Sequence, residues 1–108
     1  MANVLWSDHA LARMREQVRY IAAKSCSPEI AAKWANDIFA EADKLEDFPR
    51  LGHPLPELPD TPYLEVLVRK NFRVIYRIED KNCLIITVRR TSMLIDETTL
   101  GELDSVTG

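Results

Sequence analysis

Hydrophobic and polar residues alternate along the stretch 63–90, and this is the most regular pattern in the chain. Two polar turns, at 69–71 and 79–82, divide the stretch into three runs. A period of two residues is typical of a strand with one buried face, so the pattern predicts three sequential antiparallel strands. The predicted buried face consists of the even-numbered residues Leu64, Val66, Val68, Phe72, Val74, Tyr76, Ile78, Leu84, Ile86 and Val88.

A helical period precedes the strands. Apolar residues recur at spacings of three and four from Asp8 to about Ala23, which predicts an amphipathic helix. A second helix should begin at Ser27-Pro28-Glu29, which offers a hydroxyl cap, a first-turn proline and a carboxylate. It is expected to continue to about Phe48, and the short break at 24–27 predicts an antiparallel helical hairpin. Its apolar stripe contains Ile30, Trp34, Ile38, Leu45 and Phe48.

The remaining segments complete the predicted order of elements. Asn3–Trp6 is short and apolar, which is typical of an edge strand. Five prolines within 49–62 exclude a helix or a central strand there, so a loop packed against the body is expected. Residues 93–108 should form a C-terminal tail, with a short helical turn near Met93–Leu103. The predicted fold is α+β, ordered β-α-α-β-β-β, with a helical hairpin on one face of a small, mainly antiparallel sheet.

Composition and length restrict the class of protein. A chain of 108 residues with 46% hydrophobic and 29% charged residues is expected to form one soluble globular domain over 1–108. No apolar run approaches the roughly 20 residues of a membrane helix, and the first residues do not resemble a signal peptide. The expected compartment is therefore the cytoplasm. A net charge of −3 argues against a protein whose main role is to grip nucleic acid.

Few residues suit a metal, cofactor or nucleophilic site. His9 and His53 stand alone in the sequence, and Cys26 and Cys83 do not form a C-x-x-C pair. No serine or cysteine triad can be built from two isolated histidines, and Gly52 is not part of a glycine-rich phosphate loop. We therefore expect no metal and no cofactor.

The alternating pattern also predicts which residues lie opposite each other, because a slip of one residue would turn every side chain over. A turn at 69–71 pairs Val68 with Phe72. Pairing Ile78 with Leu84 across the next turn keeps the apolar residues together. These two registers gather several arginines on the opposite face of the sheet.

Three arginines of that face should lie close together. Arg73 is expected directly opposite Arg89, with Arg77 beside them, and like charges across a ladder are unfavourable. Glu65 is the one carboxylate expected nearby, so the surplus charge favours a bound anion or an acidic partner segment. Alternatively, the arginine stems cover aliphatic surface and their heads stay solvated. Arg90 ends its strand and should emerge at the rim. The candidate arginine face is Arg69, Arg73, Arg77, Arg89 and Arg90.

Several segments together resemble a known family. They are "SDHALARMREQVRYIA", "SPEIAAKW", "FPRLGHPLPEL", "NFRVIYRIED" and "LIITVRR". In this combination the chain is similar to the RelE/ParE superfamily of toxins from type II toxin–antitoxin systems. The resemblance implies the fold described above and a cognate antitoxin that binds the toxin as a hetero-oligomer.

The superfamily implies two alternative functions. ParE-like members inhibit DNA gyrase without being known as nucleases, whereas RelE-like members cleave mRNA on the ribosome. For the RelE-like alternative, the resemblance assigns Glu65 as general base and Arg73 as phosphate-binding arginine, with Arg90 where a histidine is common. Arginine is a poor general acid because its pKa lies above 12. The incomplete acid–base set and the net acidic charge favour the ParE-like function. A toxin-like fold that has lost toxicity is a third possibility.

The resemblance also implies where an antitoxin binds. It should lay an amphipathic segment into a groove beside the helical hairpin and offer acidic residues to the arginine face. The candidate antitoxin-binding residues are Trp34, Ile38, Arg73, Arg77 and Arg89.

Overall fold

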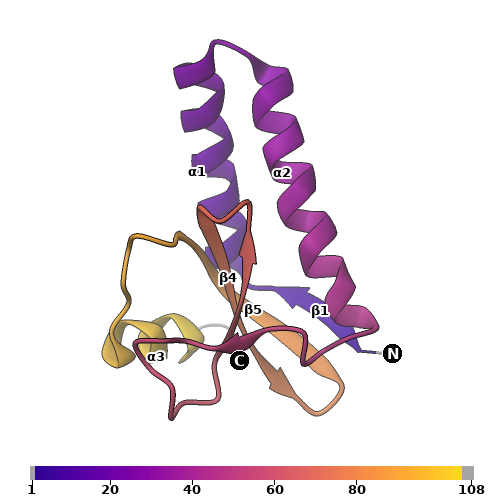
Figure 1. Ribbon diagram of the computed structural model, residues 1–108, viewed down its shortest axis with the longest axis vertical. Helices are drawn as coiled ribbons and strands as arrows, with labels where there is room; N and C mark the ends of the chain where they lie inside the picture. The colour runs from indigo at the N-terminus through magenta and orange to yellow at the C-terminus, as the bar shows by residue number, and fades with distance from the viewer. Residues whose placement is uncertain (1, 106–108) are drawn as a thin grey trace.

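The computed structural model describes residues 2–105 of the chain (Figure 1). In chain order its elements are β1 (Asn3–Trp6), α1 (Asp8–Ser25), α2 (Pro28–Asp43), the short 3₁₀ helix η1 (Lys44–Glu46), β2 (His53–Pro54), β3 (Leu64–Val68), β4 (Phe72–Glu79), β5 (Asn82–Arg90) and α3 (Glu97–Ser105). The predicted α+β class, the helical hairpin and the three sequential strands are confirmed. β2 is an addition to the predicted order, and α3 overlaps the short helical turn expected near Met93–Leu103.

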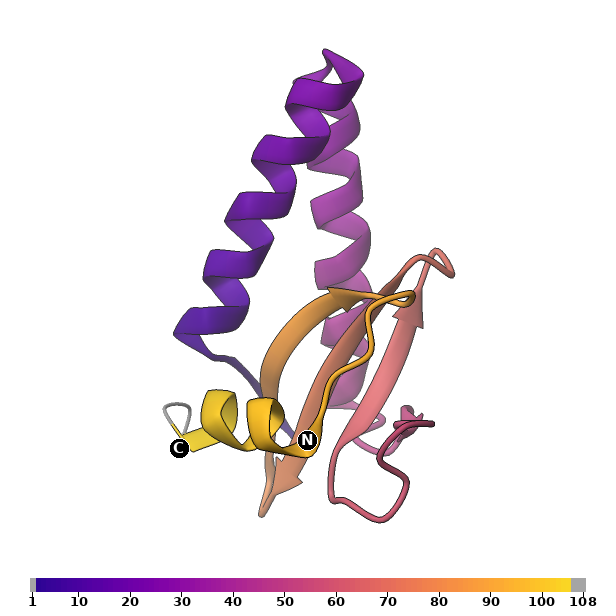
Figure 2. The ribbon, with the colours of Figure 1, turned by 90° about the vertical axis from the view of Figure 1, so that its left-hand side faces the viewer.

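The strands form one five-stranded mixed sheet in the order β1-β5-β4-β3-β2. β1 runs parallel to β5, and the other neighbouring pairs are antiparallel. α1 and α2 lie side by side and extend beyond the sheet at one end (Figure 1). α3 packs against β5 on the other side of the sheet from the hairpin's core (Figure 2). No helix among the described residues is long and apolar enough to cross a membrane.

Both long helices begin at serine caps, and Ser27 is the hydroxyl cap that was predicted for the second helix. The Ser7 hydroxyl accepts a hydrogen bond from the Ala10 amide, and the Ser27 hydroxyl accepts one from the Ile30 amide. Each bond satisfies an amide that the first helical turn leaves without a partner. The hairpin is therefore fixed at both helix starts by residues that the sequence makes recognisable.

The predicted apolar stripe of α2 is partly wrong. Ile30 is 52% exposed because it lies in the first turn of α2, at the end of the hairpin that extends beyond the sheet. Phe48 is 64% exposed because the helix ends at Asp43 and η1 redirects the chain before Pro49. The middle of the stripe is buried as expected.

The register of β3 with β4 is as predicted. Val68 pairs with Phe72, and Glu65 pairs with Ile75. The turn between the strands places Arg69 and Lys70 in the left-handed region, with φ of 54° and 63°. A turn of defined length therefore determined this register correctly.

The register of β4 with β5 is half right. Arg73 lies opposite Arg89 as predicted, but the pairing shifts between Ile75 and Tyr76 and places Ile78 opposite Cys83 instead of Leu84. An irregularity of this kind inserts one residue into a strand and reverses the side-chain alternation beyond it. Leu84 and Ile86 consequently leave the predicted hairpin-facing side and join a second apolar cluster.

The second cluster lies beneath the C-terminal segment. It comprises Leu55, Tyr63, Ile75, Leu84, Ile86, Ile95 and Leu100, all of them buried. Leu100 is fully buried in α3, so this part of the expected C-terminal tail is a packed helix. The last residues of the expected tail, 106–108, lie outside the described residues.

The proline-rich loop lies on the body, as expected, and adds the two-residue edge strand β2. Tyr76 anchors this loop: its hydroxyl donates to the Pro49 carbonyl at 2.7 Å and accepts from the Gly52 amide at 3.0 Å. A Cβ atom at position 52 would lie 2.7 Å from the Glu65 carbonyl oxygen. The close approach of the loop to β3 therefore requires glycine.

Candidate functional site

Arg73 is the centre of the arginine face and is paired with two carboxylates. Its two terminal nitrogens donate to the two Glu57 carboxylate oxygens at 2.6 and 2.7 Å. Its Nε atom lies 2.7 Å from Glu65 Oε2, an ion contact that is not aligned as a hydrogen bond. The Arg73 side chain is 3% exposed. This guanidinium is therefore neutralised within the protein and hidden from solvent.

The ion pair also connects the proline-rich loop to the C-terminal segment. Glu57 Oε2 accepts a further hydrogen bond from the Ile95 amide at 3.2 Å. The hydrogen bonds from Arg73 hold the pKa of Glu57 at about 2, well below its ordinary value. In return, the two carboxylates raise the pKa of Arg73. Glu57 thus acts as a charged clamp between three segments.

Arg77 is paired through α3. Its Nε donates to the two Asp104 carboxylate oxygens at 2.9 and 2.8 Å, and its Nη1 donates to Glu79 Oε2 at 2.9 Å. The Tyr63 hydroxyl donates to Asp104 at 2.7 Å. Burial, followed by this hydrogen bond to a carboxylate, raises the pKa of Tyr63 to about 12. The Asp104 carboxylate accepts hydrogen bonds from both Arg77 and Tyr63, and it therefore holds α3 against the sheet.

The expectation that Glu65 is the one carboxylate near these arginines is wrong. Glu57, Glu79 and Asp104 also contact them, so most of the predicted surplus charge is compensated within the chain. The sequence gives little signal of this, because Glu57 lies in an irregular loop and Asp104 in a weakly patterned segment. The physical reason to expect a bound anion at Arg73 and Arg77 is thereby removed.

Arg89 and Arg90 remain without a carboxylate partner among the described residues. Arg89 donates to the Leu94 carbonyl at 2.9 Å, and burial, followed by the nearby Arg13 and Arg73, lowers its pKa. Arg90 is exposed at the end of β5, where its guanidinium lies over the Tyr20 ring at 5.5 Å. The predicted rim position of Arg90 is confirmed. Within the arginine face, these two residues therefore keep a positive charge that no carboxylate of the described residues neutralises.

Arg69 lies apart from the other arginines. Its Nε donates to Asp37 of α2 at 2.6 Å, which ties the turn after β3 to the hairpin. Arg73 and Arg89 are thus cross-strand neighbours and Arg77 lies on the same face of β4, whereas Arg69 lies in the turn after β3.

Trp34 and Ile38 are packing residues. Both are buried in the main core, and the Trp34 ring meets the Phe72 ring edge-on with centroids 4.9 Å apart. Neither side chain can touch a partner while the hairpin stays on the sheet. Their candidacy as direct antitoxin contacts has no geometric support.

His53 has a contact that the sequence did not suggest. Its side chain is half exposed, and its Nε2 lies 3.0 Å from Glu65 Oε1. The pairing of β2 with β3 produces this contact, because His53 lies opposite Glu65. No group of three or more potential metal ligands is found within residues 2–105.

An apolar groove lies between the two helices of the hairpin, α1 and α2. It has a volume of about 390 Å³. Arg15 and Arg19 flank it, and neither forms an ion pair among the described residues. The other lining residues are Leu11, Met14, Val18, Ala35 and Phe39.

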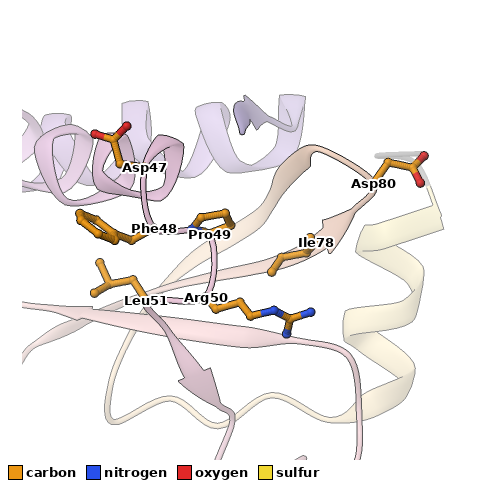
Figure 3. Close-up of a pocket in the computed structure, with 7 residues that line it drawn as sticks. All are labelled: Asp47, Phe48, Pro49, Arg50, Leu51, Ile78 and Asp80. Atoms are coloured by element: carbon orange, nitrogen blue, oxygen red, sulfur yellow. The ribbon is translucent and has the colours of Figure 1, made fainter. Parts of the chain in front are cut away.

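A larger hollow of about 630 Å³ lies between the segment 47–51, which follows η1, and the end of β4 (Figure 3). Phe48 and Leu51 lie beside each other, and Ile78 faces the same space from β4 (Figure 3). Its charged residues are mixed in sign, with Asp47 and Asp80 against Arg50. This hollow therefore shows no clear charge preference.

A family model described as the ParE toxin of the type II toxin–antitoxin system parDE matches residues 4–95. The chain belongs to the ParE toxin family. A comparison with curated proteins finds no match. Among solved structures, the chain resembles the chromosomal ParDE toxin–antitoxin system from P. aeruginosa, with a TM-score of 0.71 and 23% identity over 83% of this chain and 96% of that chain. At this identity the structural likeness supports the fold.

The ParE family match ends at residue 95, before α3. The clamp between Glu57, Arg73 and Ile95 lies within the matched range, whereas Asp104 lies beyond it. In this ParE toxin, the Asp104 carboxylate that pairs with Arg77 thus lies in a segment outside the family match.

The low pKa of Glu57 predicts a loss of stability in acid. The unfolded chain binds this proton near the ordinary pKa of 4.5, whereas the folded chain binds it only near 2. The contribution is therefore complete above about pH 4.5 and is lost as the pH falls toward 2. We expect Glu57→Gln to flatten the pH dependence of the free energy of unfolding over this interval, measured by urea denaturation. Equal slopes for the variant and the unchanged chain would contradict the pairing.

Proposed function

We propose that this ParE family toxin inhibits DNA gyrase by binding it, and that a cognate antitoxin neutralises it in the cytoplasm. Family membership supports the toxin role. The observation that favours binding over catalysis is the state of Arg73, which is buried and occupied by Glu57 and Glu65. A phosphate-stabilising arginine must be free to meet its substrate.

The alternative mRNA endonuclease needs Glu65, Arg73 and Arg90 at one place. Arg73 contacts carboxylates on the loop and α3 side of the sheet, whereas Arg90 lies over Tyr20 and Phe72 on the hairpin side. The arrangement follows from strand alternation, because Arg90 pairs with Phe72 and Arg73 pairs with Arg89. The three residues therefore do not converge on one phosphate.

The antitoxin is proposed to place an acidic amphipathic helix in the groove between α1 and α2. An apolar stripe on that helix fits the lining of the groove, and acidic residues beside the stripe would meet Arg15 and Arg19. Arg89 and Arg90 offer further positive charge for an antitoxin that continues around the hairpin. This proposal replaces Trp34 and Ile38, which are buried, by residues that line an open groove.

Inducing the toxin alone in cells tests the proposed target. We expect growth arrest with relaxed plasmid DNA and no codon-linked mRNA ends in primer-extension maps. Co-expression of the protein encoded beside the toxin gene should restore growth. Codon-linked cleavage with normal supercoiling would contradict the gyrase proposal and favour the endonuclease. Unaffected growth would indicate that toxicity has been lost.

A further inference from the structure

Apolar side chains are exposed around the larger hollow, at the end of β4 (Figure 3). Phe48 is 64% exposed and Leu51 is 47% exposed, and Ile78 lines the same hollow. A second hollow of about 290 Å³ adjoins the first, since Pro49, Ile78 and Asp80 line both. Exposed apolar surface that is bordered by charged residues often marks an interaction site. The apolar patch of Phe48, Pro49, Leu51 and Ile78 is therefore a candidate interface.

Charges of both signs surround the apolar patch. Asp47, Arg50 and Asp80 line the larger hollow, and Lys81 lines the adjoining one. None of these four side chains forms an ion pair among residues 2–105. The two acidic and two basic residues leave the rim of the patch without net charge. A strongly acidic or strongly basic partner would therefore meet as many like charges as opposite ones.

A second copy of this chain offers the complementary arrangement of charges. In a twofold-symmetric contact both subunits use the same surface, so each pair of touching residues occurs twice, once in each direction. A surface that bears both signs can then neutralise itself. In Figure 3, Ile78 lies between Arg50 and Asp80, and Phe48 lies beside Leu51. A twofold axis through the apolar patch can thus bring Arg50 of one copy to Asp80 of the other, and Phe48 to Leu51.

The apolar patch does not overlap the surface proposed for the antitoxin. The groove between α1 and α2 shares no lining residue with either hollow beside the patch. The patch follows η1 at the C-terminal end of α2, whereas Arg15 and Arg19 of the groove belong to α1. A contact made through the patch is therefore an inference independent of the proposed binding of gyrase and antitoxin.

We propose that two copies of this chain form a twofold-symmetric dimer through the apolar patch. Phe48 of one copy lies against Leu51 of the other, and Arg50 of each copy pairs with Asp80 of the other. Removal of Phe48 and Leu51 from water is the main source of affinity. An apolar centre with charges at its rim is the usual arrangement of an interface. The patch is small, so we expect a dissociation constant on the order of 10 μM.

Sedimentation equilibrium of the full chain, at concentrations from about 1 to 200 μM, measures the proposed dimer. Phe48→Asp introduces a charge on both sides of the contact, so we expect it to weaken dimerisation by about 100-fold or more. Ile30→Asp is the matched control, because Ile30 is 52% exposed in the first turn of α2, at the other end of that helix. This control should change the dissociation constant by less than about twofold.

A mixture of two charge variants tests which residues meet in the dimer. Arg50→Asp alone brings two acidic residues together at each rim contact, and Asp80→Lys alone brings two basic residues together. We expect each variant by itself to dimerise at least about tenfold more weakly than the unchanged chain. Mixed in equal amounts, the two variants should form a heterodimer, because each acidic rim then faces a basic one. Lysine suits the backbone at position 80, since Asp80 and Lys70 have similar φ values of 54° and 63°.

Several results would overturn the proposed dimer. An unchanged chain that stays monomeric at about 200 μM would show that the apolar patch does not bind a second copy. A dimer that persists in Phe48→Asp, or charge variants that fail to associate when mixed, would assign the contact to another surface. A monomeric chain whose Phe48→Asp variant no longer arrests growth would assign the patch to the cellular target instead. Circular dichroism and thermal melts check that every variant folds.

Discussion

Replacing Arg73 with methionine is expected to lower the free energy of unfolding by about 3–5 kcal/mol. The substitution leaves Glu65, which is 4% exposed, and Glu57 as carboxylates without their cation. A buried charge without its partner is far less favourable than the intact pair. Urea denaturation at neutral pH measures the change. A loss below about 1 kcal/mol would show that Arg73 is not the electrostatic centre of this face.

Two further variants make the Arg73 result specific. Arg90→Met removes an exposed arginine from the neighbouring strand and is expected to change stability by about 0.5 kcal/mol or less. Adding Glu57→Gln to Arg73→Met should recover part of the loss, because one of the unpaired charges is then absent. Additive losses in the double variant would contradict an ion-pair explanation.

Replacing Trp34 with alanine is expected to lower the free energy of unfolding by about 3–5 kcal/mol. Trp34 is 3% exposed and packs against Phe72, so its removal leaves a cavity between the hairpin and the sheet. The indole nitrogen has no hydrogen-bond partner among the described residues, so the loss comes from packing. Thermal or urea denaturation measures it.

Ile30→Ala serves as the control for Trp34→Ala. Ile30 lies on the same helix but is half exposed, so we expect a change of about 0.5 kcal/mol or less. If Trp34 serves mainly in packing, folded Trp34→Ala protein should bind the antitoxin as the unchanged chain does. Near-normal stability together with lost antitoxin binding would instead restore Trp34 as a direct contact.

The regular part of the fold was predictable because local signals agree there. Ser7 and Ser27 mark the helix starts, and the turn at 69–71 determines the register of β3 with β4. The alternating pattern failed within β5, where one inserted residue moves Leu84 and Ile86 to the other face. Both faces of β5 are apolar, so periodicity alone could not locate the shift.

The position of the arginine face was predicted correctly, but its neutralisation by carboxylates was not predicted. Strand parity placed Arg73 and Arg89 opposite each other correctly. The carboxylates that neutralise the face come from Glu57 in a proline-rich loop and Asp104 in a C-terminal helix, both distant in sequence. Tertiary packing brings such residues together, and neither periodicity nor a local motif can predict these contacts. Because Glu57 and Asp104 neutralise Arg73 and Arg77, these arginines hold segments of the fold together and do not form an anion site.

The open edge of β3 follows from the same loop. Tyr76 draws the chain around Gly52 against the sheet and leaves Leu67 uncovered. Sequence alternation identified β3 but could not show how little of its edge β2 covers. Thus the loop that neutralises Arg73 through Glu57 also covers only the first part of the β3 edge.

A supercoiling assay with purified DNA gyrase tests the central claim most directly. The purified toxin is titrated into gyrase and relaxed plasmid, and the cognate antitoxin is then added to the inhibited reaction. We predict dose-dependent loss of supercoiling that the antitoxin reverses once it matches the toxin in amount. Full gyrase activity at every toxin concentration, from toxin that is folded and arrests growth in cells, would contradict the proposed function.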